Sequence, residues 1–233
     1  MPATVSVIIP TRNQPTLMAE AVHAVLDQSR RVNEIIVRDS LPTDESRHVA
    51  ETLRTILTDA RDAPTFHYAS GEDLGLAYAV NQASTLATGD YLWVCPPADR
   101  ALPHTIEMLA GVLDAQPEVL SVAGKYRVLT GPGAGGGQQE PPNDWPDLTT
   151  GTPLRHLLEY PFLPLSAVMF RATAFANIGR FQDALKDHAG FDALIRLACA
   201  GPMVVLEDPV CLAAKPPHQA AHVSQQYLSL IHI

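Results

Sequence analysis

The sequence has few of the features that would place it outside the ordinary globular proteins. Only three residues are cysteines, and Cys95, Cys199 and Cys211 lie far apart in apolar segments. They predict reduced, buried thiols rather than a disulfide framework or a zinc site. No apolar run approaches the ~20 residues of a transmembrane helix, and the first strand pattern begins so near Met1 that no signal peptide is expected. These absences predict a cytoplasmic protein without a transmembrane segment.

Basic residues are also scarce, since 16 Lys and Arg stand against 25 Asp and Glu and give a formal net charge of −9. Such a chain lacks the basic surface that binds nucleic-acid backbones, so no nucleic-acid partner is expected. An anionic nucleotide remains compatible with this charge, because the field of a local pocket can differ from that of the whole. The 233 residues, 46% of them hydrophobic, are enough to bury the core of one large domain.

The most informative stretch is residues 5–13, VSVIIPTRN, in which a β-branched run ends at Pro10 and a polar patch of Thr11, Arg12 and Asn13 follows. The pattern predicts a buried parallel strand whose carboxyl end opens into a polar loop, where open α/β sheets bind ligands. Strand and helix patterns then alternate, which predicts a parallel sheet with right-handed crossovers. Further strands are expected at 34–38, 67–68, 91–95, 119–129, 165–170 and 204–206, and helices at 17–26, 45–60, 76–87, 103–115 and 191–200.

Residues 131–153 are rich in Gly and Pro and are predicted to form no regular element. They are either a surface loop or an active-site lid. No Lys-Ser or Lys-Thr follows these glycines, so they do not form a phosphate-binding loop of the P-loop type.

VSVIIPTRN resembles the opening of the family 2 glycosyltransferases, and further family landmarks follow in the same order. The second strand ends in Asp39, at the first of two acidic positions that contact the nucleotide, with Ser40 at the second. Asn81 closes a segment similar to the family's Ala-Arg-Asn helix start, with Val80 in place of Arg. The other similar segments are Asp73–Leu76, Gly89–Leu92, Ala101–Leu109 and Arg171–Phe181.

The resemblance implies a GT-A-type, Rossmann-like α/β fold: a mostly parallel sheet flanked by helices in a single domain. Residues 1–115 would be the nucleotide-sugar (donor) binding half and residues 116–233 the acceptor-side half. The implied reaction moves a sugar from a nucleotide-sugar, with a UDP-sugar favoured, to a hydroxyl of an unknown acceptor, with inversion. The implied donor-binding residues are Pro10, Thr11, Arg12, Asn13, Asp39, Asp73, Asn81, Asp99 and His218.

The family's metal motif, Asp-x-Asp-Asp, would stand where this chain has Pro96-Pro97-Ala98-Asp99. In the family a divalent cation, Mn or Mg, bridges this motif and the donor diphosphate. Charges ~4 Å apart at an effective dielectric of about 20 interact by ~4 kcal/mol, so the loss of two carboxylates predicts severely weakened metal binding. Asp99 alone would either retain a metal ion through water, or cap the next helix or bind solvent instead. Without a metal, the diphosphate would be held by Arg12, Arg100 or a histidine.

The family's catalytic base, in a Glu-Asp pair before the acceptor helix, would stand where this chain has Ala189-Gly190. A base must lie within hydrogen-bond reach of the attacking hydroxyl. The nearest substitutes are Asp187, His188 and Asp192, and a shift of two residues would bring the first two to the family position. Each is either the catalytic base or a surface or capping residue.

Near the C-terminus, Lys215-Pro216-Pro217-His218 is similar to the family's basic-x-x-His segment, which closes over the donor phosphates. The resemblance implies that His218 contacts the phosphates or, with Asp99, a metal ion.

Three functions are compatible with these patterns. The first is an active glycosyltransferase. The second is a catalytically silent GT-A-like domain that binds a nucleotide or a protein partner, which the loss of metal and base positions would predict. The third is a nucleotidyltransferase, whose expected Gly-rich, Arg/Lys-bearing first loop is missing from the sequence.

Overall fold

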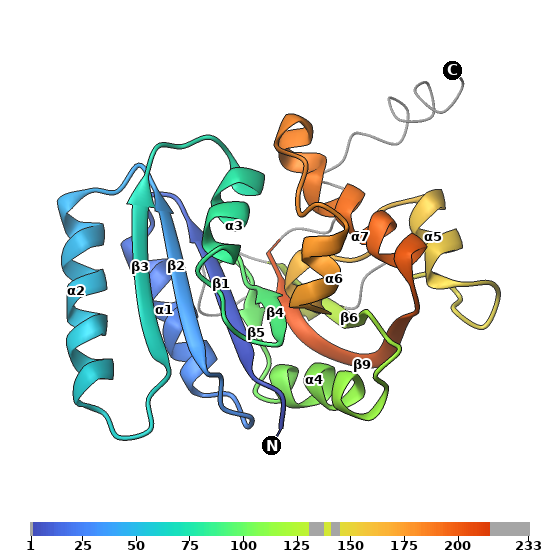
Figure 1. Ribbon diagram of the computed structural model, residues 1–233, viewed down its shortest axis with the longest axis horizontal. Coiled ribbons are helices and arrows are strands. Elements are labelled where there is room, and N and C mark those ends of the chain that lie inside the picture. Colours follow the sequence, from blue (N-terminus) through green and yellow to red (C-terminus); the bar gives the residue numbers. More distant parts are fainter. Residues whose placement is uncertain (1, 131–137, 141–144, 215–233) are drawn as a thin grey trace.

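The structure is a computed structural model that describes residues 2–130, 138–140 and 145–214, with the backbone alone for residues 130, 138–140 and 187. Within this part of the chain, one sheet runs in the order β3-β2-β1-β4-β8-β6-β9-β5, with β7 paired to β6 (Figure 1). The strands are β1 Val5–Thr11, β2 Glu34–Ser40, β3 Thr65–Gly71, β4 Tyr91–Val94, β5 Arg100–Ala101, β6 Ser121–Thr130, β7 Gln138–Glu140, β8 Val168–Arg171 and β9 Met203–Ala213. The helices are α1 Pro15–Leu26, α2 Asp44–Asp59, α3 Leu76–Ser84, α4 Thr105–Ala115, α5 Pro153–Glu159, α6 Ala172–Asn177 and α7 Ala189–Ala200, with short 3₁₀ turns η1 Leu165–Ala167 and η2 Asp183–His188.

The first strand lies at the centre of the parallel part of the sheet. β1 pairs in parallel with β2 on one side and with β4 on the other, and β2 pairs in parallel with β3. All seven residues of β1 and all seven of β2 are buried, as the continuous apolar pattern of the two segments predicts for strands covered on both faces.

Alternate residues of β1 enter two separate cores, one on each face of the sheet. Val7 and Ile9 pack with α1, α2 and α4, whereas Ile8 packs with α3, α6 and α7 on the opposite face. The helices therefore flank the sheet in two layers (Figure 1). Among the described helices none is both long and apolar enough to cross a membrane.

The second half of the sheet mixes strand directions. β8 runs antiparallel to both β4 and β6, β6 and β9 are parallel, and β5 and β7 are antiparallel edge pieces. Most of the registered residue pairs are nevertheless parallel, because the long ladders of β1, β2, β3, β6 and β9 supply them.

Three expectations of the sequence need correction in this half. Residues 131–153 were expected to contain no regular element, yet β7 pairs with β6 through Glu140 opposite Val128. The strand expected at 165–170 begins only at Val168, because Leu165–Ala167 forms a 3₁₀ turn. The strand expected at 204–206 extends over Met203–Ala213, and its register against β6 shifts around Lys125. The polar residues Glu207 and Asp208 interrupt its apolar pattern and concealed its length.

Candidate functional site

A pocket of about 600 Å³ opens at the carboxyl ends of β1 and β4. The chain proceeds from β1 to β2 and β3 on one side, and β4 lies on the other side of β1, so the pocket lies at the point where the strand order reverses. Open α/β sheets bind ligands at such a switch point. The pocket is lined by Pro10, Thr11, Arg12, Gln14, Ser40, Asp73, Leu74, Gly75, Leu76, Ala79, Pro96, Pro97, Ala98 and Lys186.

Asp39, in β2, fixes the loop after β1 through a hydrogen bond to its backbone. One carboxylate oxygen of Asp39 accepts the Asn13 backbone N–H at 3.1 Å, and the other accepts the Tyr68 hydroxyl at 3.0 Å. Burial, the Asp39 charge and this hydrogen bond together raise the pKa of Tyr68. Asn13 has a φ of 48°, a left-handed conformation that Asn tolerates better than most residues. Asp39 is fully buried, so in this structure its carboxylate shapes the loop, while Ser40 beside it lines the pocket.

An ion pair connects the β1 loop to the loop that precedes α3. Arg12 Nε lies 2.7 Å from Asp73 Oδ2, with the Arg12 side chain 68% exposed and that of Asp73 20% exposed. The other oxygen of Asp73 accepts the N–H of Gly75 at 3.2 Å. Gly75 has a φ of 96° and directly precedes α3, so the ion pair joins the β1 loop to the start of this helix.

Thr11 contributes a hydroxyl that has no hydrogen-bond partner within the described part of the chain, although the oxygen is buried. Thr11 is only 5% exposed and lines the pocket. A buried hydroxyl without a partner costs free energy, and a ligand in this pocket would offer it one.

The wall formed after β4 lacks the chemistry of a metal site. Pro96, Pro97 and Ala98 line the pocket without a metal-binding atom in their side chains. Both oxygens of Asp99 are occupied, because Ser166 Oγ donates to one at 2.7 Å and the Ala214 N–H to the other at 2.9 Å. Burial raises the pKa of Asp99, and these two hydrogen bonds oppose the rise. Asp99 therefore ties the β4 loop to η1 and to the end of β9.

No group of three or more His, Cys, Asp and Glu side chains suited to a metal ion occurs among residues 2–130, 138–140 and 145–214. The donor set found here does not fit a divalent cation. His218, the other expected metal ligand, lies outside the described residues, and so does Lys215. Arg100, named above as an alternative diphosphate ligand, lines a separate hollow with Asp99 and pairs with Glu20 at 3.7 Å.

Asn81 is not among the pocket-lining residues, and its amide group contacts the chain ahead of η2 instead. Its Nδ2 donates to the Phe181 carbonyl and to Asp183 Oδ1, each at 2.9 Å, and its Oδ1 accepts the Phe181 N–H at 3.0 Å. These bonds hold the 181–188 segment against α3. From that segment Lys186 reaches the pocket wall.

The expected base positions lie where η2 passes into α7. Ala189 and Gly190, which the resemblance aligns with the family's acidic pair, are buried. The Asp192 carboxylate is bound by Arg196, whose Nε and Nη2 lie 2.8 and 2.5 Å from the same oxygen. His188 is partly buried at the end of η2, and for Asp187 only the backbone is described.

The sequence patterns did not indicate Lys186, which lines the pocket, or Ser166, which binds Asp99. Lys186 follows no motif, and the segment that carries it is bound by Asn81, which is 100 residues from Phe181 in the chain. Ser166 lies in a short turn and meets Asp99 across 67 positions. Contacts over such separations leave no periodic signal in a single sequence.

Comparison with known proteins places these features in a wider group. The family model described as Glycosyl transferase family 2 matches residues 6–179. S. aureus TarS 1–349 in complex with UDP-GlcNAc is 18% identical, with a TM-score of 0.73 over 98% of this chain and 65% of that chain. The mannosyltransferase PcManGT from Pyrobaculum calidifontis, in complex with GDP-Man and Mn²⁺, is 19% identical, with a TM-score of 0.70 over 100% of this chain and 65% of that chain.

Longer S. aureus TarS is 18% identical with a TM-score of 0.71, and the match covers 91% of this chain but 37% of TarS. The chain thus spans between 37% and 65% of the length of these proteins. At these identities the likeness shows the fold alone. No curated protein matches the chain.

Proposed function

Because the chain belongs to glycosyltransferase family 2 and has the GT-A fold of its structural neighbours, we propose that it transfers a sugar from a nucleoside-diphosphate sugar to a hydroxyl group. The observation that carries this proposal is the position of the pocket at the carboxyl ends of β1 and β4, where Thr11 and Arg12 line it. The proposal assigns donor binding to residues 1–115 and the acceptor side to residues 116–233.

The residues around the pocket divide into those that would touch the donor and those that would position them. Pro10, Thr11 and Arg12 line it directly, together with Asp73. Asp39 acts through the Asn13 N–H. Neighbours of the same fold bind UDP-GlcNAc or GDP-Man, which supports a nucleotide-sugar donor, and we propose a UDP-sugar.

The transfer itself would invert the anomeric centre. The acceptor oxygen attacks the anomeric carbon as the bond from that carbon to the diphosphate oxygen breaks. The nucleoside diphosphate leaves with the bonding electrons, and a base removes the proton of the acceptor hydroxyl. Asp187 and His188 are our proposed bases, because Lys186 immediately before them lines the pocket. Asp192 is assigned a structural role through its bond with Arg196.

A second function is favoured by one specific observation, which is that Pro96, Pro97 and Ala98 form the pocket wall after β4. The resemblance also aligns Ala189-Gly190 with the family's acidic pair. A chain that has lost these acids fits a nucleotide-binding domain that acts with a protein partner and performs no transfer.

Calorimetric titration with UDP, GDP and their sugars, first with Mn²⁺ and then with EDTA, separates these functions. Binding of one nucleotide-sugar together with slow release of its nucleoside diphosphate would support the transferase. Binding without release, over hours and with simple sugars added as acceptors, would support the silent domain. If none of the nucleotides binds under either condition, the donor pocket is wrongly assigned and both functions fall.

A further inference from the structure

Among the side chains that the structure describes, one cation that lines the pocket has no ion-pair partner. Its charged lining residues are Arg12, Asp73 and Lys186. Arg12 and Asp73 form an ion pair at 2.7 Å. Lys186 is exposed and has no ion-pair partner among the side chains that the structure describes. In a chain of net charge −9, the side chains that line the pocket thus include two cations and one acid.

The backbone at Lys186 is held in a conformation that residues with a side chain rarely adopt. Its φ is 49° and its ψ is −117°, a region in which glycine alone avoids steric conflict with Cβ. Strain of this kind persists where the surrounding structure imposes it, and it concentrates at ligand sites. Here the three hydrogen bonds of Asn81 to Phe181 and Asp183 fix the segment just before Lys186.

The same pocket lacks carboxylates where a metal-binding wall would need them. Pro96, Pro97 and Ala98 offer no ligand, and both oxygens of Asp99 accept hydrogen bonds from the protein. A diphosphate in this pocket would therefore meet an apolar wall on the β4 side and cationic side chains on the other. Its charge requires a partner, because an anion removed from water without one is unstable.

We propose that the ammonium group of Lys186, together with Arg12 of the same pocket lining, binds the diphosphate of the donor directly and replaces the divalent cation of the family. This inference rests on the proposed function, since it assigns the diphosphate subsite of that same pocket. An ammonium group supplies a full charge and three N–H donors, which suits phosphate oxygens. Donor binding would then be independent of metal.

The difference in affinity between a nucleoside diphosphate and its monophosphate measures what the diphosphate subsite contributes to binding. In EDTA, UDP or GDP should bind the wild type about tenfold or more tightly than UMP or GMP, as expected for charge-assisted hydrogen bonds to one phosphate. Lys186→Ala should reduce this preference to about twofold or less and leave the affinity for the monophosphate unchanged. Lys186→Arg should retain most of it. Addition of Mn²⁺ should change none of these values by more than about twofold.

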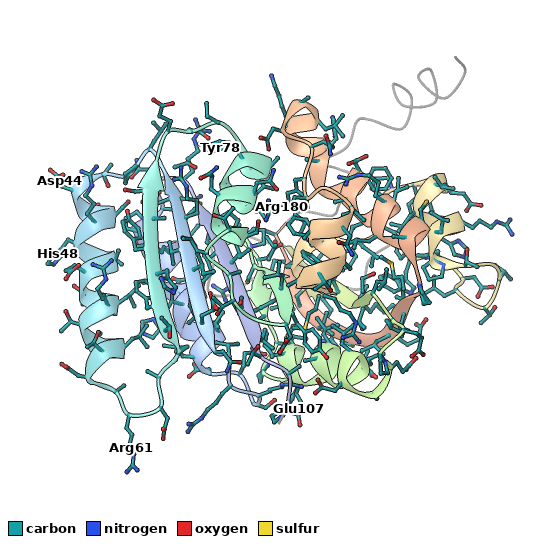
Figure 2. All side chains as sticks on the ribbon, viewed as in Figure 1. Asp44, His48, Arg61, Tyr78, Glu107 and Arg180 are labelled. Atoms are coloured by element: carbon teal, nitrogen blue, oxygen red, sulfur yellow. The ribbon has the colours of Figure 1, made fainter. Side chains whose placement is uncertain are left out.

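Two further variants make the result specific. Lys186→Gly removes the charge but suits the backbone at that position, so its melting temperature should rise while its diphosphate preference falls. If Lys186 had only a structural role, its replacement by Gly would not raise the melting temperature and at the same time lower the diphosphate preference. Arg61→Ala, a loss of equal charge in the loop between α2 and β3 at the other end of the sheet (Figure 2), should alter neither.

The outcomes also distinguish a failure of the Lys186 proposal from a failure of the proposed glycosyltransferase function. A diphosphate preference that requires Mn²⁺, or one that survives in Lys186→Ala and Lys186→Gly, would overturn the role of Lys186 and leave the glycosyltransferase proposal intact. Absence of any nucleotide binding by the wild type would refute both proposals.

Discussion

The hydrogen bonds between Asn81 and the 181–188 segment hold the part of the pocket wall that contains Lys186. The amide of Asn81 makes three hydrogen bonds, one from the Phe181 N–H, one to the Phe181 carbonyl and one to Asp183. Phe181 is buried and packs edge to face on Phe175 at 5.2 Å. Replacement of Asn81 by Ala removes all three bonds and leaves the two backbone groups of Phe181 without these partners.

The magnitude follows from the number of bonds. Each intramolecular hydrogen bond contributes about 1 kcal/mol net, and a buried group left unpaired costs about 1–3 kcal/mol. Asn81→Ala should therefore lower the free energy of unfolding by about 2–4 kcal/mol, which in a chain of this size is a decrease in melting temperature of about 4–16 °C. The same variant should weaken nucleoside diphosphate binding more than monophosphate binding, because Lys186 is no longer held at the pocket wall.

Urea unfolding followed by circular dichroism measures the first effect and calorimetry the second. Asn81→Asp provides a graded variant: it retains the acceptor for the Phe181 N–H, loses both amide donations and adds a charge beside Asp183. Gln82→Ala is the matched control, since Gln82 is the next residue of α3 and is exposed. If Asn81→Ala and Gln82→Ala have unfolding free energies within about 0.5 kcal/mol of each other, the hydrogen bonds of Asn81 do not stabilise the fold as described.

Three further predictions concern the pocket and the sheet beneath it. Asp99→Ala should lower the unfolding free energy by about 1–3 kcal/mol, because the N–H of Ala214 and a serine hydroxyl lose their acceptor. An Mn²⁺ titration should give the same heat with the wild type and the variant. A loss of Mn²⁺ binding in the variant would instead identify Asp99 as a metal ligand. Thr11→Val should leave thermal stability unchanged or slightly higher, since the lost hydroxyl has no described partner, but should weaken nucleotide binding; a clear drop in melting temperature would contradict this. Hydrogen bonds from the N–H and hydroxyl of Thr4 lower the pKa of Asp90 from its ordinary value of 3.8, so its stabilising effect is complete above pH 3.8 and is lost as the pH falls through the lowered pKa. The stability difference between wild type and Asp90→Asn, measured by urea unfolding, should therefore shrink below pH 3.8, and a constant difference down to acid unfolding would exclude this linkage.

Much of the fold of residues 1–115 could be predicted from local patterns. The run Val5–Ile9 and the segment Glu34–Arg38 are apolar enough to form buried strands, and both do so in parallel register. Thr11 and Arg12 of the polar patch after Pro10 line the pocket, at the carboxyl end of the strand, where open α/β sheets bind ligands. Period and composition carry this information because adjacent strands and helices alternate within short stretches of the chain.

The fold of residues 116–233 was harder to predict, for physical reasons that two of its strands illustrate. β9 contains Glu207 and Asp208 within its length, and part of it pairs with β6 across a shift in register, so its pattern lacks a single period. The three-residue strand β7 lies in a Gly- and Pro-rich segment and exists through its pairing with β6. Tertiary pairing overrides local preference in short strands of this kind.

The sequence by itself determined the α/β class, the strand that carries the pocket and the absence of acids at positions 96–98, because all three depend on residue type and short-range order. Only the tertiary structure decided what the remaining groups do. It engages both oxygens of Asp99 with Ser166 and Ala214, and it brings Lys186 to the pocket through Asn81. A side chain's role is set by the partners that folding places within hydrogen-bond reach, and those partners here lie 67 to 115 positions away in the chain.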